Sequence, residues 1–202
     1  KGSATRGPGD PFEAYWQALA ALAGVPLDRL PWMRTTISGE RVRASYNGGL
    51  IVAQRAAGAL GRWAEIFFGS VRAGLRPYRD TGIDVVASMG AVGRESSEFW
   101  GSNQAALALA MWGGNARVRH LGDRYNVPLH LIAQGGDIDP RWRAAPPAHV
   151  HYHGMFANRQ HEVALDLLSR LGTADDRIAW LRARVPLVGR AARRADAALA
   201  SS

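Results

Sequence analysis

The stretch Ala148-His149-Val150-His151-Tyr152-His153-Gly154-Met155-Phe156 places three histidines at alternate positions ahead of a glycine. In an extended strand successive side chains point to opposite faces, so the histidines would share one face while Val150 and Tyr152 occupy the other. Gly154 has no Cβ and permits a turn in which the backbone approaches a ligand closely. The pattern predicts either a half-buried strand with solvated histidines or a strand that presents imidazole nitrogens to a cation.

Composition narrows the chemistry that is open to this chain. Its 202 residues are enough for one domain, or one and a fraction. The absence of cysteine excludes disulfides, thiolate zinc sites and cysteine nucleophiles. Lys1 is the only lysine among 25 basic residues, which argues against Walker-lysine and Schiff-base chemistry. The net charge of +8 therefore comes from arginine, which suits phosphate recognition, although abundant Ala, Gly and Arg are also typical of proteins from GC-rich genomes.

Hydrophobic periodicity predicts an α/β fold with a small mixed sheet and flanking helices. Helices are expected where apolar residues recur every three or four positions, and strands where short apolar runs follow turn residues. The predicted helices are Asp10 to Gly24, Arg55 to Gly74, Ser102 to Trp112, Gln160 to Leu171, Asp175 to Arg184 and Val188 to Ala200. The predicted strands are Val42 to Tyr46, Leu50 to Ala53, Ile83 to Ala87, Arg117 to Leu121 and Val150 to Tyr152.

Five local features complete this prediction. Residues 1–9, rich in Gly and Pro, are expected to be a flexible lead, and residues 135–147 a long loop. Asn47-Gly48-Gly49 favours a hairpin between the two apolar segments that flank it; the alternative is a loop that leads into one buried strand and exposes backbone to a ligand. The helix from Arg55 to Gly74 is expected to be the main helix covering the sheet. Ser102 is expected to cap its helix, which would aim Asn103 and Gln104 out of the helix N-terminus.

Four short motifs stand in a fixed order along the chain. They are Tyr46-Asn47-Gly48-Gly49-Leu50, Asn103-Gln104, Leu121-Gly122-Asp123-Arg124-Tyr125-Asn126 and His151-Tyr152-His153-Gly154. In this order they resemble the second half of a GT-A type nucleotide-sugar glycosyltransferase, most like the glycogenin and galactosyltransferase-like family. That family carries F-N-x-G in a strand, D-Q at a helix start, then L-P-x-x-[FY]-N and H-[FY]-x-G. The resemblance covers about residues 42–156 and implies a GT-A-like fold.

The function implied by this resemblance is transfer of a sugar from a nucleoside diphosphate donor to an acceptor. In such a site a divalent cation, Mn or Mg, offsets the charge that builds on the diphosphate. His151 matches the metal-binding histidine of the family, and neutral amides near the sugars can bond hydroxyls. The resemblance implies catalytic roles for Asn103 and Gln104. It implies substrate-binding roles for Asn47, Gly48, Gly49, Asn126, Gly154 and Arg159.

The chain departs from the family pattern in three places. The D-x-D motif that supplies the other metal ligands precedes F-N-x-G in the family, and residues 1–41 contain none. Asp137-Ile138-Asp139 has the letters but follows the motifs, and it is expected to lie in a loop. Asn103 stands where the family usually has Asp, and Ala157 stands where it has Lys. We therefore expect a fragment that lacks the donor-nucleotide half and binds Mn or Mg only together with the D-x-D half.

The expected organisation is a lead and N-terminal helix at 1–41, the catalytic portion at 42–156 and a helical extension at 157–202.

Two other functional classes stay open beside the glycosyltransferase. The histidines, with Asp137 or Asp139, could form the zinc or iron centre of a hydrolase or small barrel. The C-terminal arginines could form a polyanion-binding module, although no nucleic-acid signature is present. No apolar run reaches the roughly 20 residues that cross a bilayer, and a cytoplasmic location is expected.

Overall fold

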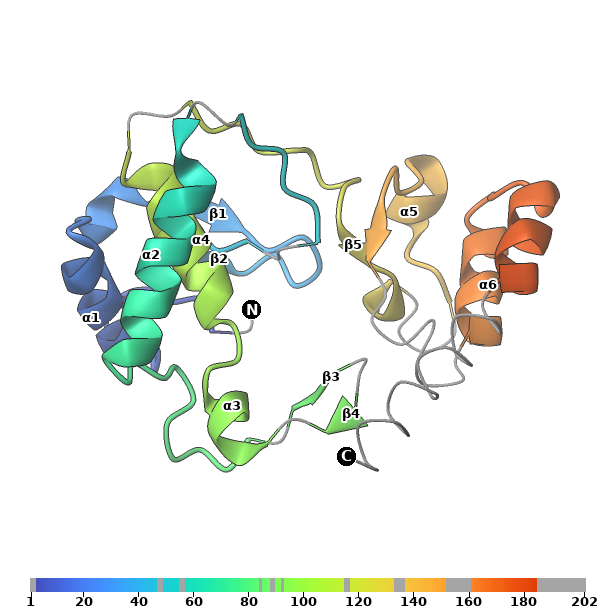
Figure 1. Ribbon diagram of the computed structural model, residues 1–202. Helices are drawn as coiled ribbons and strands as arrows, with labels where there is room; N and C mark the ends of the chain where they lie inside the picture. The colour runs from blue at the N-terminus through green and yellow to red at the C-terminus, as the bar shows by residue number, and fades with distance from the viewer. Residues whose placement is uncertain are drawn as a thin grey trace. The chain divides into compact units, whose positions relative to one another are not determined.

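The protein consists of helices and small two-stranded sheets (Figure 1). The computed structural model describes residues 3–46, 49–54, 57–83, 85–87, 90–91, 93–114, 117–132, 137–151 and 161–184. The chain divides into two compact units. Unit 1 comprises residues 1–85 and 92–120, and unit 2 comprises residues 86–91 and 121–202. The mixed helix and strand content agrees with the predicted α/β class, and the division falls inside the 42–156 range of the resemblance.

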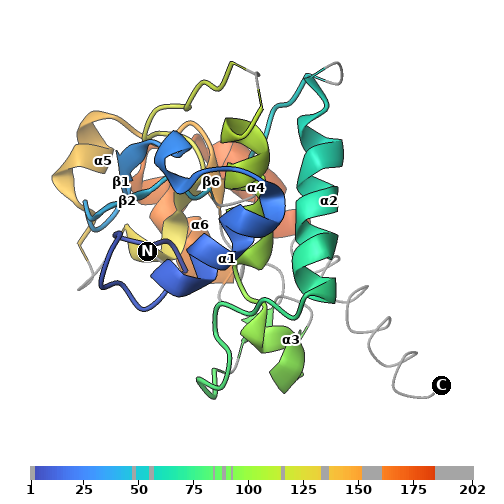
Figure 2. The same ribbon diagram turned by 90° about the vertical axis from the view of Figure 1, so that its left-hand side faces the viewer.

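Three helices dominate unit 1, namely α1 (Glu13–Ala23), α2 (Ala59–Arg72) and α4 (Ser102–Trp112). They lie side by side, with α2 along α4 and α1 against both (Figures 1 and 2). All three were predicted as helices, and this is confirmed. The prediction that α2 covers a sheet is wrong, because α2 packs on helices. The physical reason lies in α4, which is buried at every position from Ala105 to Ala110 and whose alanines let α2 approach closely.

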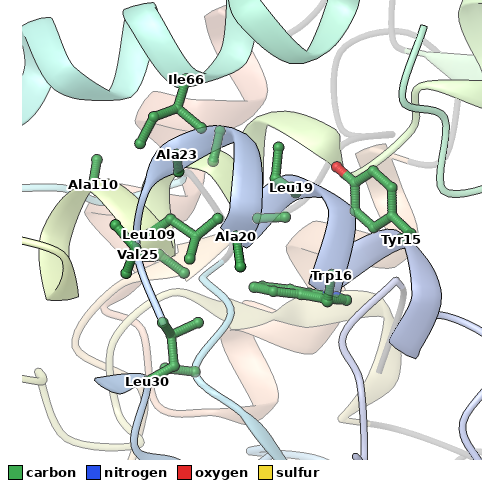
Figure 3. Packing of buried hydrophobic residues seen from close by; sticks show 14 residues of the cluster. Tyr15, Trp16, Leu19, Ala20, Ala23, Val25, Leu30, Ile66, Leu109 and Ala110 are labelled. Carbon is green, nitrogen blue, oxygen red and sulfur yellow. The ribbon is translucent and has the colours of Figure 1, made fainter. Parts of the chain in front are cut away.

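The core of unit 1 is built where α1 meets α2 and α4 (Figure 3). Trp16 and Leu19 of α1 are fully buried, and Ile66 of α2 points toward α1 with 1% of its surface exposed. Burial of each such side chain stabilises the fold by about 1.5–3 kcal/mol. The indole Nε1–H of Trp16 donates to the Ser3 carbonyl oxygen at 2.7 Å, so its polar atom is also satisfied.

The segment before α1 is packed, so the prediction of a flexible lead is wrong for its described part. Thr5 is fully buried, and its hydroxyl donates to a carboxylate oxygen of Glu13 at 2.5 Å. The Asp10 carboxylate accepts from the Arg6 guanidinium at 2.9 Å and from the backbone N–H of Phe12 at 3.0 Å. These polar contacts fix the turn that leads into α1, and Gly24 ends the helix with φ of +63° as expected.

The hairpin of unit 1 lies earlier in the chain than predicted. Strand β1 (Trp32–Arg34) pairs antiparallel with β2 (Arg41–Arg43), with Met33 opposite Val42. Residues 50–54 form no strand, so the predicted hairpin around Asn47-Gly48-Gly49 is wrong. Val42 buries all but 2% of its surface whereas Val52 is 86% exposed, so burial favours the earlier pair. The bond from Thr35 N to Glu40 O, at 2.9 Å, closes the turn.

Two shorter elements complete unit 1. The 3-10 turn η1 (Leu27–Arg29) follows α1, and α3 (Arg94–Glu98) precedes α4 (Figure 1). Arg76 bonds two carboxylates of α3, donating to Glu98 at 3.0 Å and to Glu95 at 2.6 Å. The predicted strand at Arg117 to Leu121 is wrong, since these residues carry no regular structure.

In unit 2, β5 (Val127–Pro128) pairs parallel with β6 (Val150–His151). A second short pair joins β3 (Val86–Ala87) to β4 (Gly90–Ala91), which confirms only the end of the strand predicted at 83–87. The 3-10 turn η3 (Leu129–Leu131) follows β5 directly. The prediction of one sheet that contains both Leu50 to Ala53 and Val150 to Tyr152 is wrong, because Leu50 to Ala53 form no strand; Tyr152 lies outside the described residues.

The helices of unit 2 are partly as predicted. Helix α6 (His161–Arg170) and a helix at residues 175–184 are confirmed, while the helix predicted at 188–200 lies outside the described residues. The predicted loop at 135–147 instead contains α5 (Pro140–Ala144). Asp139 caps α5 by accepting from Arg141 N at 3.0 Å, and Pro140 follows in the first turn. Trp142 of α5 is buried, which anchors this short helix. In the described part of the chain, no helix has the length and hydropathy to span a membrane.

Candidate functional site

The pairing of β5 with β6 brings two of the four motifs together in unit 2. A turn closed by Tyr125 N and Gly122 O at 3.0 Å leads to Asn126, whose φ is +56°. Val127 N then donates to His149 O at 3.0 Å. Asn126 and His149 therefore stand next to each other across the strand pair, and His151 follows in β6 opposite Pro128. The predicted site residue Asn126 thus directly precedes β5, and the predicted metal ligand His151 lies in its partner strand β6.

The histidines of this strand pair do not form a complete metal centre with the other described residues. His149 and His151 are both half-buried, and the Nδ1 atom of His149 is buried without a hydrogen-bond partner among the described residues. Asp139, proposed above as an extra ligand, caps α5 and also pairs with Arg141 at 3.0 Å. No group of three or more His, Asp or Glu side chains that could hold a metal occurs within the described ranges. His153, Gly154 and Arg159 lie outside them.

Unit 1 carries a groove of about 630 Å³ between α2 and the start of α4, termed here the α2–α4 groove. Its walls are aromatic: Phe67 and Phe68 lie side by side with ring centroids 5.4 Å apart, and Phe68 is 56% exposed. Trp100, which is 45% exposed, stands before α4. Five aromatic residues line the groove together with Ser96, Ser102 and Asn103; they are Trp63, Phe67, Phe68, Phe99 and Trp100.

The polar end of the groove is the first turn of α4. The indole Nε1–H of Trp63 donates to the Asn103 carbonyl oxygen at 2.7 Å, which ties α2 to this turn. The side-chain amide of Asn103 is exposed and makes no hydrogen bond within the part of the chain that the structure describes. Gln104, the other predicted catalytic residue, is half-buried and is not among the residues that line the groove. The groove therefore presents one available amide beside aromatic rings.

The prediction that Ser102 caps α4 is wrong. The capping position belongs to Gly101, whose φ of +82° suits glycine, and a Cβ there would collide with the Ser3 hydroxyl. The helix begins at Ser102, directly after this cap, so Ser102 lies inside its first turn. Its Oγ is buried and has no hydrogen-bond partner among the described residues. Ser102 thus contributes a buried, unsatisfied hydroxyl to the wall of the groove.

At the other end of α4, three side chains form a hydrogen-bonded chain. Trp112 donates its Nε1–H to the Tyr46 hydroxyl oxygen at 2.6 Å, and that hydroxyl lies 2.5 Å from Nε2 of His120. Because Tyr46 accepts from Trp112, its own proton is free for His120. Burial raises the pKa of the Tyr46 hydroxyl, and the hydrogen bond from Trp112 lowers it in part. This chain fixes the residue directly before Asn47.

Ligands bind at the ends of elements in α/β proteins, so Asn47, Gln104 and His151 are also expected to converge on one cleft, and this stays a prediction. Asn47 and Gly48 lie outside the described residues, and Gln104 and His151 belong to different units. Gly49 is exposed. The aromatic groove was missed by sequence reasoning because Trp63 and Phe67 were assigned to packing. The available signal was the uninterrupted pair Phe67-Phe68, since one helix face cannot bury both side chains.

Comparison with family models, with curated proteins and with solved structures found no match for this chain.

Proposed function

We propose that this chain is part of a GT-A-like glycosyltransferase that moves a sugar from a nucleoside diphosphate donor to an acceptor. The observation that carries the proposal is the available amide of Asn103 beside the aromatic α2–α4 groove. It stands at the helix start where the order of the four motifs calls for a residue that contacts sugar. The pairing of β5 with β6 adds support, because it brings Asn126, directly before β5, next to the strand that contains His151, and these residues belong to two further motifs.

The chemistry of the groove suits a sugar. A pyranose has faces of C–H groups and a rim of hydroxyls, so exposed aromatic rings can cover the former while an amide bonds the latter. Asn103 and Ser102 stand in the first turn of an 11-residue helix, where the helix dipole favours electron-rich oxygens. Asn103 is a neutral amide that orients a hydroxyl and does not remove its proton.

In this proposal, His151, Gly154 and Arg159 bind the donor diphosphate. The described residues supply imidazoles but no set of ligands complete enough for a Mn or Mg ion. Hard cations prefer oxygen ligands, which a D-x-D motif would provide. We therefore assign no step of the reaction to a metal held by these residues alone. The role assigned to unit 2 is contact with the phosphates.

The test is sugar binding by the whole chain, measured by saturation-transfer NMR with a panel of hexoses and nucleoside diphosphate hexoses. Asn103→Ala is expected to weaken binding about tenfold, the effect of losing a hydrogen bond near 1.4 kcal/mol. Gln17→Ala is the matched control, because Gln17 is an exposed amide on α1 that does not line this groove. The proposal is contradicted if no sugar of the panel binds, or if both variants weaken binding equally.

A further inference from the structure

One face of the β1–β2 hairpin gathers three arginines around a tryptophan. The register places Trp32 opposite Arg43 and Arg34 opposite Arg41. Directly opposed residues point to the same side, as do alternate residues of one strand, so all four side chains share one face. Met33 and Val42 take the other face, which packs against the core. The face formed by Trp32, Arg34, Arg41 and Arg43, termed here the arginine face, is therefore turned away from the core.

The guanidinium groups of this face are held in place. Those of Arg41 and Arg43 lie 4.3 and 4.2 Å from the centroid of the Trp32 ring. Arg43 also donates to the Leu30 carbonyl oxygen at 3.1 Å, and Arg34 donates to that of Gly39 at 3.0 Å. A guanidinium already fixed by a ring or a carbonyl loses less conformational freedom when it binds an anion.

No carboxylate neutralises these charges within the described residues. Glu40 is the nearest acid along the chain, but it contacts Arg6 at 3.8 Å and the Ser38 hydroxyl at 3.1 Å. Arg41 makes no hydrogen bond or ion pair in the described part of the chain. Like charges directly opposite each other in a hairpin are destabilising, and Arg34 faces Arg41 in this way. An arrangement of this kind becomes favourable when an anion binds the free N–H groups.

A phosphate group is the anion that fits best. Its oxygens match the planar fork of a guanidinium, which donates two parallel hydrogen bonds. A single-stranded nucleic acid would require a free ring for base stacking, and the Trp32 ring is already covered by two guanidinium groups. The arginine face therefore favours an isolated phosphate over a nucleic acid.

Along the chain, the arginine face lies close to the Asn47 motif, to which the resemblance gives a substrate-binding role. The chain that follows β2 leads to Tyr46 and the Asn47 motif, and the four residue steps from Arg43 to Asn47 span at most about 14 Å. The donor diphosphate is assigned above to residues of unit 2, whereas the arginine face and Asn103 both belong to unit 1. We propose that the arginine face binds a phosphate monoester carried by the acceptor, so that the acceptor is a phosphorylated sugar or a lipid phosphate. This inference rests on the proposed function.

The experiment measures binding of a hexose 6-phosphate and of the same unphosphorylated hexose to the full chain by calorimetry at low ionic strength. The phosphate is expected to strengthen binding. Arg41→Gln should weaken binding of the hexose 6-phosphate about tenfold and leave binding of the hexose unchanged. Arg34→Gln should also weaken binding of the hexose 6-phosphate. The matched control is Arg119→Gln, which removes one charge from an exposed arginine that has no partner among the described residues, and it should change affinity less than twofold.

Two further probes identify the source of the phosphate. Vesicles containing phosphatidic acid test the lipid form, and a loss of vesicle binding in Arg41→Gln without loss in Arg119→Gln supports a lipid phosphate. A nucleoside diphosphate tests the donor. If Arg41→Gln weakens binding of the nucleoside diphosphate but not of the hexose 6-phosphate, the arginine face binds the donor and the inference is overturned.

The failure of this inference is distinct from the failure of the proposed function. If the hexose binds through Asn103 but the 6-phosphate adds nothing, the acceptor assignment fails while the groove stands. If Arg41→Gln and Arg119→Gln weaken phosphate binding equally, the effect is one of net charge, and the arginine face is not a site. Phosphate binding that depends on Arg41 without any dependence of sugar binding on Asn103 would instead contradict the proposed function.

Discussion

Replacement of Tyr15 by phenylalanine is expected to stabilise the protein. Tyr15 of α1 is buried in the core of unit 1 with 8% of its surface exposed (Figure 3). Its hydroxyl is buried and has no hydrogen-bond partner among the described residues. An unsatisfied buried hydroxyl costs about 1–3 kcal/mol, and phenylalanine removes it while keeping the ring. We expect a gain near 1 kcal/mol at pH 7, or about 2–4 °C in Tm for a chain of this size.

The gain should increase at alkaline pH. Burial raises the pKa of the Tyr15 hydroxyl well above its ordinary value of 10.0. The unfolded chain therefore loses this proton first, and stability present below pH 10 is lost as pH rises toward the folded pKa. At pH 11, one pH unit above the unfolded pKa, the wild-type protein loses about 1.4 kcal/mol that the phenylalanine variant retains.

Urea-induced unfolding followed by far-UV circular dichroism at pH 7 and pH 11 measures both effects. Tyr125→Phe is the control, because Tyr125 is 44% exposed, and it should change the free energy of unfolding by less than about 0.5 kcal/mol at either pH. A destabilisation above about 1 kcal/mol by Tyr15→Phe at pH 7 would refute the reasoning, since it would mean that the hydroxyl has a partner. A gain that does not grow between pH 7 and pH 11 would refute the titration argument.

Gly101→Ala should destabilise the protein by roughly 1–3 kcal/mol, because residue 101 has φ of +82° and the new Cβ meets Ser3. Gly82→Ala, where φ is +66° in open space, should cost less, and urea unfolding compares the two. The hydrogen bond from the Arg76 guanidinium holds the pKa of Glu98 below its usual 4.5, so the stability contributed by Glu98 is lost as pH falls through that lowered pKa. Arg76→Gln should reduce this acid dependence in an acid-unfolding titration. An unchanged unfolding profile would contradict the prediction. Zinc should bind the chain only weakly in calorimetry, because the described residues hold no set of three ligands; tight binding that His151→Ala abolishes would favour a self-contained histidine site.

The helices were predictable because their apolar spacing is regular over three turns or more. Helix α4 was recognised from Ser102 to Trp112, with Gly113 after it, and α1 from its Asp10-Pro11 start and Gly24 end. The same Asp-Pro signal stands at Asp139-Pro140 and marks the start of α5. The helix was not predicted, because residues 135–147, with their prolines after Asp139, were interpreted as a loop.

The strands were predictable only in part. A pair of two-residue strands such as β5 and β6 is too short to show alternation, and its pairing is decided by contacts far apart in sequence. The Asn-Gly turn signal favoured a hairpin after Val42, but the chain pairs Val42 with Met33 before it. The segment around Val52 is apolar and yet exposed, which no local pattern reveals.

The candidate site, too, could be predicted from the sequence only where it depends on local patterns. The place of Asn103 at a helix start followed from sequence, because helical periodicity is local, although the cap was wrongly assigned to Ser102 instead of Gly101. The groove beside it depends on how α2 packs along α4, since the same aromatic spacing is typical of a buried helix face. The arginine face likewise required the register of β1 with β2, which places residues seven to eleven positions apart on one surface.

The most direct test of the central claim is the location at which a sugar binds. The indole N–H signals of Trp63 and Trp100, assigned in the NMR spectrum by single Trp→Phe replacements, report on the α2–α4 groove, and that of Trp142 reports on unit 2. Titration with the hexose that binds most tightly in the saturation-transfer panel is predicted to shift the signals of Trp63 and Trp100, to leave that of Trp142 in place, and to lose these shifts in Asn103→Ala. Sugar binding that leaves the Trp63 and Trp100 signals unchanged would contradict the account.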